Sequence, residues 1–315
     1  MTNFSSRRML LQALAALPLL HAGRAFAQTS GNADPWSSRF ATMERSTPGF
    51  EGRLGVFALD TLTGASMGYR ADERFPFCST FKAILAGAIL RRSEQVPGLL
   101  QQRISYTKRD LIAHSPVTEK HLARGMTVAQ LCAATVQYSD NAAANLLMRI
   151  LGGPKAVTAF ARTIGDNTFR LDRWETELNT AIPDDPRDTT TPVAMTRSLH
   201  RLSIGDALPA VQRAQLVQWL RGNTTGATRI QAGVPGDWQV GDKTGTGLHG
   251  SASDIAVVWP PHRAPLVITI YTTQKQQDAK ANDAIIAAAA SVVAEWIVGT
   301  EQTIASANPI LKQKV

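Results

Sequence analysis

Residues 78–82 read Cys-Ser-Thr-Phe-Lys and open an apolar run that continues as Ala-Ile-Leu-Ala-Gly-Ala-Ile-Leu over residues 83–90. This run predicts a buried helix that starts at Ser79, and residues three apart on a helix share a face. The hydroxyl of Ser79 and the amine of Lys82 are therefore expected to point at the same place. A lysine on an apolar helix is unfavourable to bury unless it has a partner or a chemical role. Because Ser105 and Lys108 repeat the same spacing, the pair decides nothing by itself.

The amino-terminal 27 residues differ from the rest of this 315-residue chain, which is 44% hydrophobic and long enough for one large domain or two moderate ones. Arginines at 7 and 8 precede a short apolar run that contains Pro18, and Ala25-Phe26-Ala27 offers small residues at a cleavage site. This pattern predicts an export signal of the twin-arginine type. The run is too short to span a bilayer, and we expect no membrane span after the signal.

Charge and residue spacing argue against two other classes of protein. Removing residues 1–27, which hold three arginines and no acidic residue, lowers the formal net charge from +8 to +5. The remainder has no basic run and no zinc-finger spacing, so nucleic-acid binding has little support. The six histidines show no ligand spacing such as His-x-His, which argues against a metal hydrolase. We therefore expect neither a metal nor a cofactor.

The order of predicted elements places strands at both ends of the chain and helices between them. We expect helices at 34–48, from 79, at 127–134, from 192 and at 280–298, and strands at 54–60, 67–70, 238–244, 254–259 and 266–272. This order predicts an α+β fold in which an antiparallel sheet, built from both termini and flanked by helices, carries an inserted all-helical domain. The expected parts are 28–70 and 221–315 for the α/β domain and 71–220 for the helical domain.

Two further polar motifs each have a structural and a chemical interpretation. Ser139-Asp140-Asn141 precedes an alanine-rich run and would suit a helix cap. Lys243-Thr244-Gly245 lies in a predicted strand, where a lysine can simply protect an edge. The glycine pattern of residues 245–250 fits a dinucleotide-binding loop, but a strand follows it where that loop requires a helix.

Together, Ser79-x-x-Lys82, Ser139-Asp140-Asn141 and Lys243-Thr244-Gly245 occur in the order found in class A β-lactamases and penicillin-binding proteins. Residues 173–179 (Arg-Trp-Glu-Thr-Glu-Leu-Asn) and 184–192 look like the Ω-loop, 173–188, and its exit. From residue 28 onward the sequence resembles a class A serine β-lactamase. The pair at Ser105 does not fit, since it opens no apolar helix and lies too close to Ser139.

The resemblance implies hydrolysis of the β-lactam ring of penicillins and cephalosporins through a serine acyl-enzyme, and hence antibiotic resistance. It implies a monomer in the bacterial periplasm whose partner is a small-molecule β-lactam. Two other functions remain open: a cell-wall peptidase that penicillin inhibits, and a β-lactam sensor, which is normally tethered to a membrane. Glu175 and Asn179 argue against the peptidase, because they would activate the water that frees the acyl-enzyme.

The resemblance also assigns roles to individual residues. Ser79 would be the nucleophile, either Lys82 or Glu175 the base for acylation, Ser139 a proton relay, and Glu175 with Asn179 the group that activates the hydrolytic water. Two backbone N–H groups, of Ser79 and Thr246, would form the oxyanion hole. Substrate binding would involve Asn141, Lys243, Thr244, Thr246, Arg229 and His114, and an ion pair between Arg173 and Asp188 would close the Ω-loop.

Three departures from the family pattern bear on these expectations. Thr176 replaces the proline that often follows the glutamate, and the resemblance implies that the Glu175–Thr176 peptide bond is nevertheless cis. Gly247 stands where carbapenem-hydrolysing relatives carry a cysteine that bridges to the position of Cys78, which weakens the case for carbapenems. Cys132 matches a position that bridges in some relatives, but its partner position here is Ala86. We therefore predict two free thiols.

Overall fold

The structure is a computed structural model that describes residues 35–307, with side chains described as far as residue 300. The predicted export signal, residues 1–27, lies outside the described residues. The α-helices are α1 Pro35–Ser46, α2 Phe81–Gln95, α3 Val128–Gln137, α4 Asn141–Leu151, α5 Pro154–Thr163, α6 Pro192–Ser203, α7 Ala210–Arg221, α8 Ile230–Gly233 and α9 Asp283–Ala307. The strands are β1 Gly52–Asp60, β2 Ser66–Tyr69, β3 Phe75–Pro76, β4 Arg103–Ile104, β5 Met126–Thr127, β6 Thr189–Thr190, β7 Gln239–Thr246, β8 Ala252–Trp259 and β9 Leu266–Gln274. Short 3₁₀ turns are η1 Cys78–Thr80, η2 Leu99–Gln101, η3 Lys108–Asp110, η4 Thr118–His121 and η5 Glu177–Thr180.

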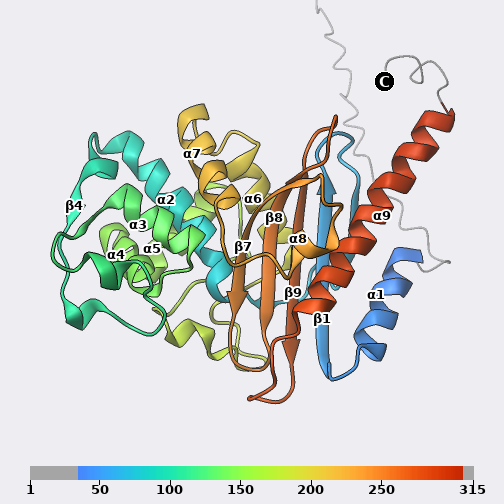
Figure 1. The fold of residues 1–315 in the computed structure, drawn as a ribbon, viewed down its shortest axis with the longest axis horizontal. Coiled ribbons are helices and arrows are strands. Elements are labelled where there is room, and N and C mark those ends of the chain that lie inside the picture. The colour runs from blue at the N-terminus through green and yellow to red at the C-terminus, as the bar shows by residue number, and fades with distance from the viewer. Residues whose placement is uncertain (1–34, 308–315) are drawn as a thin grey trace, which may run out of the picture. The chain divides into compact units, whose positions relative to one another are not determined.

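The main sheet has five strands in the order β2-β1-β9-β8-β7, and each neighbouring pair is antiparallel. Strands β1 and β2 come from the first part of the chain and β7 to β9 from the last, so the two ends build one sheet (Figure 1). Helices α2 to α5 lie beside this sheet, in green and cyan in Figure 1. The predicted α+β fold class is confirmed.

Helices cover both faces of the sheet. Helices α1, α8 and α9 pack on one face, and α6 and α7 pack on the other. Every residue of β9 and nearly every residue of β8 is therefore buried. This double coverage explains why neither strand alternates between buried and exposed positions, and why even the polar residues of β8 and β9, such as Asp254 and Thr269, are buried.

Helix α2 is the centre of the helical half, because its first ten residues, Phe81 to Leu90, are all buried. The helix begins two residues later than predicted: Ser79 lies in the 3₁₀ turn η1, which leads directly into α2. Two other predicted helix starts are confirmed. Thr127 and Gln130 form a capping box at α3, and Thr191 caps α6, with a proline at the first helical position.

The segment predicted as all-helical, 71–220, differs from that expectation in one respect. It also contains four two-residue strands, which form the small pairs β3–β6 and β4–β5. These strands are too short to show period-two patterning in the sequence. The described residues pack as one compact unit, so the division into lobes stays a prediction.

Helix α9 is long and apolar enough, by length and composition alone, to cross a membrane over residues 283–300. Half of those residues are buried inside the fold. Because α9 packs on β9, β8, β1 and α1, its apolar character is accounted for by the core that it covers.

Candidate active site

Ser79, Lys82 and Glu175 meet around one carboxylate oxygen. Ser79 lies in η1, Lys82 lies in the first turn of α2, and Glu175 lies in the loop before η5. Glu175 Oε1 is 3.3 Å from Ser79 Oγ and 3.0 Å from Lys82 Nζ. The side chains of Lys82 and Glu175 are fully buried. The hydroxyl and the amine thus reach the same atom, as their spacing predicted.

The amine of Lys82 connects this carboxylate with the Ser-Asp-Asn motif. Nζ donates to Ser139 O at 2.8 Å and to Asn141 Oδ1 at 2.5 Å. Burial lowers the pKa of Lys82, and the carboxylate of Glu175 opposes that shift. The amine is therefore held in place and loses its proton more readily than a free lysine.

Asp140 positions this motif. It caps α4 by accepting a hydrogen bond from Ala143 N, and its other oxygen accepts from the backbone N–H groups of Val117 and Thr118 at 2.9 Å. The cap holds Ser139 in a left-handed conformation with φ 57°. Both the capping and the chemical interpretation of the motif are therefore compatible with its geometry.

The hydroxyl of Ser139 lies between two lysines. Its Oγ accepts from Lys243 Nζ at 3.1 Å and lies 3.3 Å from Lys82 Nζ. Since a hydroxyl oxygen has two acceptor positions and one proton, the proton remains free to be donated into the site. Burial and the like charge of Lys82 lower the pKa of Lys243 to about 7.

Glu175 is held at both its side chain and its backbone. Asn179 Nδ2 donates to Glu175 Oε2 at 2.5 Å. Asn145 was missed by the sequence analysis: its Nδ2 donates to Glu175 O at 2.9 Å, and its Oδ1 accepts from Glu175 N at 3.0 Å. The available signal was an asparagine inside an apolar helix, four residues after Asn141 and hence on the same face. The Glu175–Thr176 peptide bond is cis, as the resemblance implied.

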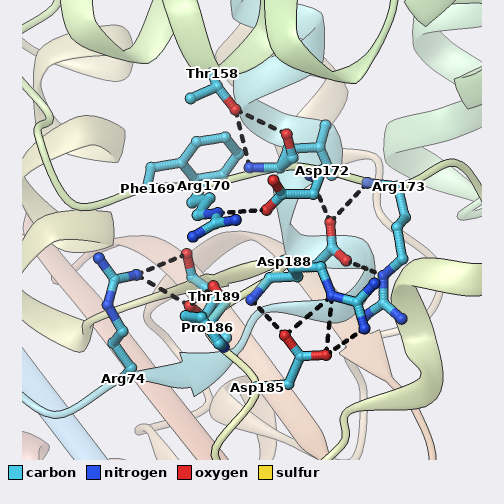
Figure 2. Close-up of polar contacts among 12 residues, drawn as sticks. Arg74, Thr158, Phe169, Arg170, Asp172, Arg173, Asp185, Pro186, Asp188 and Thr189 are labelled. Atoms are coloured by element: carbon cyan, nitrogen blue, oxygen red, sulfur yellow. Dashed lines mark hydrogen bonds and ion pairs between the residues drawn. The ribbon is translucent and has the colours of Figure 1, made fainter.

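The two ends of the Ω-loop are tied together at Asp188, which lies between Arg173 and the backbone of Asp172 (Figure 2). Arg173 Nε lies 2.5 Å from Asp188 Oδ2, and the two side chains are 14% and 0% exposed. Asp188 Oδ1 also accepts from the backbone N–H groups of residues 172 and 173 at 2.8 and 3.0 Å. The expected ion pair is therefore present, and it is largely buried.

Strand β7 runs directly alongside the backbone of Ser79. A Cβ atom on Gly245 would lie only 2.9 Å from Ser79 N and 2.7 Å from Phe77 O, so only glycine fits here. This contact brings Thr246, the last residue of β7, to the same side of the site. Arg229 supports that end of the strand by donating to Thr246 Oγ1 at 2.8 Å and to Gly245 O at 2.7 Å.

Two predicted substrate-binding residues lie less directly in the site. The hydroxyl of Thr244 is 2.5 Å from that of Thr225, in the neighbouring loop. His114 is exposed, and its Nε2 forms a 3.0 Å hydrogen bond with Tyr138 O. It is joined to the site through its backbone, because its carbonyl accepts from Asn141 N at 3.0 Å.

Both cysteines are free and buried, as predicted. A Cβ atom on Gly247 would lie 2.8 Å from Cys78 Sγ, so the partner position of the bridging relatives is adjacent but holds no thiol. The glycine pattern of residues 245–250 leads into β8 and not into a helix. Within residues 35–307, no three His, Cys, Asp or Glu side chains gather as metal ligands would.

Comparison with known proteins agrees with this geometry. The sequence matches the beta-lactamase enzyme family over residues 39–297. It is 56% identical over 293 residues to the carbapenem-hydrolyzing beta-lactamase KPC of Klebsiella oxytoca, covering 92% of this chain and 97% of that relative. It is 52% identical over 289 residues to beta-lactamase CTX-M-8 of Citrobacter amalonaticus, covering 92% and 97%.

Solved structures give the same result. The beta-lactamase of Desulfarculus baarsii superposes with a TM-score of 0.82 at 59% identity, covering 84% of this chain and 99% of that one. A variant of the reconstructed class A beta-lactamase of the last common ancestor of Gram-negative bacteria gives 0.80 at 57% identity, covering 83% and 98%. The chain belongs to the class A β-lactamase family, whose members hydrolyse the β-lactam ring and so confer antibiotic resistance.

Proposed function

We propose that this β-lactamase forms its acyl-enzyme on Ser79 and that Glu175 frees the enzyme by activating a water molecule. One observation carries the proposal: the buried Glu175 Oε1 lies 3.3 Å from Ser79 Oγ. A carboxylate at that distance can hold a water against an ester on Ser79 and take its proton. A peptidase that penicillin merely inhibits needs no such group.

In the acylation step, Ser79 Oγ attacks the carbonyl carbon of the β-lactam, and its proton passes to Glu175 or to the neutral form of Lys82. The backbone N–H groups of Ser79 and Thr246 bind the oxyanion. As the C–N bond breaks, Ser139 donates its proton to the ring nitrogen. Ser139 regains a proton from one of the two lysines that contact its oxygen.

In the deacylation step, water attacks the ester carbonyl while Glu175, oriented by Asn179, accepts a proton from it. Ser79 Oγ leaves and recovers its proton. Lys243, Thr244, Thr246 and Arg229 bind the substrate carboxylate, and Asn141 and His114 line the side where the acylamino group enters. Penicillins and cephalosporins are the proposed substrates. Carbapenems rank below them, because Gly247 offers no partner for Cys78.

We further propose that residues 1–27 direct export to the periplasm and that the mature protein is a monomer. Replacing Arg7 and Arg8 with lysine would retain the enzyme in the cytoplasm, as cell fractionation would reveal. Size-exclusion chromatography tests the monomer. A periplasmic double variant, or a dimer of wild type, would contradict the respective proposal.

Glu175→Ala tests the central claim. With excess penicillin, this variant should accumulate a covalent adduct on Ser79, detected by intact-protein mass spectrometry, while wild type turns over. Glu177→Ala removes an exposed carboxylate from the same loop and is the matched control, which should behave as wild type. Equal steady turnover by Glu175→Ala and wild type would remove Glu175 from the role proposed for it.

A further inference from the structure

Two buried aspartates, Asp242 of β7 and Asp254 of β8, lie on the face of the sheet opposite to Lys243. In the register of β7 and β8, Asp242 pairs with Ala256 and Thr244 pairs with Asp254, so the two aspartates are diagonal neighbours on one face of the sheet. They are 3% and 0% exposed, and their side chains lie close enough for each to shift the pKa of the other. Lys243 follows Asp242 and projects from the opposite face, toward the active site.

The surroundings of this pair supply few proton donors. Asp242 Oδ2 accepts from Asn223 Nδ2 at 2.7 Å, and Asp254 Oδ2 accepts from Ile230 N at 3.0 Å. No N–H or hydroxyl group among the described residues donates to the buried Asp254 Oδ1. The guanidinium of Arg229 forms its ion pair with Asp283 and acts on Asp254 through its charge alone, which opposes the rise in the pKa of Asp254.

Two neighbouring carboxylates in a buried site do not both stay ionised when burial and their mutual repulsion outweigh the attraction of nearby cations, which here are Lys243 and Arg229. Burial raises the pKa of both groups, and for Asp254 the neighbouring Asp242 charge raises it further. A proton between the two groups gives Asp254 Oδ1 the donor that it otherwise lacks. Such a pair titrates as a unit.

We propose that Asp242 and Asp254 share one proton, and that the single negative charge left on the pair keeps Lys243 protonated for the substrate carboxylate. The two aspartates touch neither substrate nor reacting atoms, so they are positioning residues for a known reaction. The inference rests on the proposed role of Lys243.

Lys243 needs such a counter-charge. It is fully buried, and its pKa falls to about 7 through burial and through the like charges of Lys82 and Arg229. Asp242 and Asp254 are the groups that oppose this fall. Glu175, the other nearby anion, is engaged with Lys82 on the helical side.

A chain of hydrogen bonds also joins the pair to Thr244, a proposed substrate-binding residue of β7. From Asp242 the chain passes through Asn223 to Thr225, whose Oγ1 donates to Asn223 Oδ1 at 2.9 Å. Thr225 in turn contacts Thr244 Oγ1 at 2.5 Å. The pair therefore supports the position of Thr244 in addition to the charge of Lys243.

Asparagine substitutions distinguish a pair that carries one shared negative charge from a pair that carries two independent negative charges. In Asp242→Asn or Asp254→Asn, the remaining aspartate no longer faces an acid and ionises, so the single charge is kept. The alkaline limb of kcat/KM for benzylpenicillin should then stay where it is in wild type. The double variant has no charge, and its alkaline limb should move to lower pH by about one unit, which is about tenfold in kcat/KM above the midpoint. A comparable shift in each single variant, or none in the double variant, would overturn the proposal.

Infrared difference spectroscopy provides a second readout. It does not depend on catalysis, and it does not require that the double variant folds. At neutral pH, wild type should show the carbonyl band of one buried protonated carboxyl group, and either single variant should lose it. Absence of that band from wild type would overturn proton sharing. If Lys243→Gln left the alkaline limb unchanged, the proposed role of Lys243 would fail, whereas the infrared result would still decide the state of the pair.

Discussion

Replacing Asp188 with asparagine removes the charge that closes the Ω-loop while almost preserving the shape of the side chain. Asparagine Oδ1 can still accept the two backbone hydrogen bonds from residues 172 and 173 that Asp188 Oδ1 receives. Its Nδ2, however, would face Arg173 Nε, so two donors would oppose each other where a 2.5 Å ion pair stands in wild type. The substitution therefore targets one charge-assisted contact.

The expected loss follows from the burial of this pair. Breaking a buried ion pair by removing one partner typically costs about 3–5 kcal/mol. Arg173 is 14% exposed and keeps a 2.8 Å hydrogen bond to Thr180 Oγ1, so we expect the lower end, about 3 kcal/mol. That change shifts the equilibrium between docked and undocked loop by about two orders of magnitude. Since the loop carries Glu175, deacylation should slow by up to that factor.

The assay compares Asp188→Asn with Asp185→Asn on the same loop. Asp185 pairs with Arg187, which is 45% exposed, and such surface pairs contribute about 0–1 kcal/mol. With penicillin, Asp188→Asn should show a burst and a persistent adduct on Ser79 by mass spectrometry, whereas Asp185→Asn should turn over as wild type does. Indistinguishable steady-state rates for the two variants would refute the claim that the buried pair holds Glu175 in register.

Three further substitutions test separate parts of the site. Asn145→Ala leaves the buried N–H and C=O of Glu175 without hydrogen-bond partners, and each unpaired group costs about 1–3 kcal/mol. We therefore expect a lower melting temperature by calorimetry and a slower deacylation step. An unchanged melting temperature together with an unchanged deacylation rate would contradict this. Gly247→Cys should form a disulfide with Cys78, because its Cβ would lie 2.8 Å from Cys78 Sγ. Thiol titration of the denatured, unreduced variant should then find one thiol, and three would exclude the bridge. Arg229→Leu should raise KM for penicillin by about 10–100-fold with a smaller change in kcat, since a charged hydrogen-bond donor is lost; an unchanged KM would count against a carboxylate-binding role.

Features that depend on adjacent residues could be predicted from the sequence. Thr191 followed by a proline identified the start of α6, and Ser79 with Lys82 identified two groups that share a face. In both cases the residues concerned lie within one helical turn, where the spacing in the sequence alone determines the direction in which each side chain points. Even here the 3₁₀ geometry of η1 was missed, because nothing in the residue types distinguishes a tight first turn from an α-helical one.

Features that depend on contacts between distant segments could not be predicted. Asn145 acts on Glu175, thirty residues away, and its own helix gives no indication of which backbone it will meet. Asp242 and Asp254 become neighbours only through the register of β7 and β8, and a one-residue slip would separate them. The order of the motifs identified the family, because relatives with this order share such contacts. The motifs give no information about residues outside them.

The distribution of charge in the site shows why those unpredicted contacts matter. Lys82, Lys243 and Arg229 are all buried, and burial lowers the pKa of both lysines. Buried cations of this kind weaken folding unless anions lie close to them. Glu175, Asp283 and the proposed single charge of the aspartate pair match these three cations in number, but the charge of the pair lies on the opposite face of β7 from Lys243 and offsets only part of the penalty. A substrate carboxylate bound at Lys243, as proposed, would place an anion directly beside it, so part of the energy withheld from folding would become available for binding.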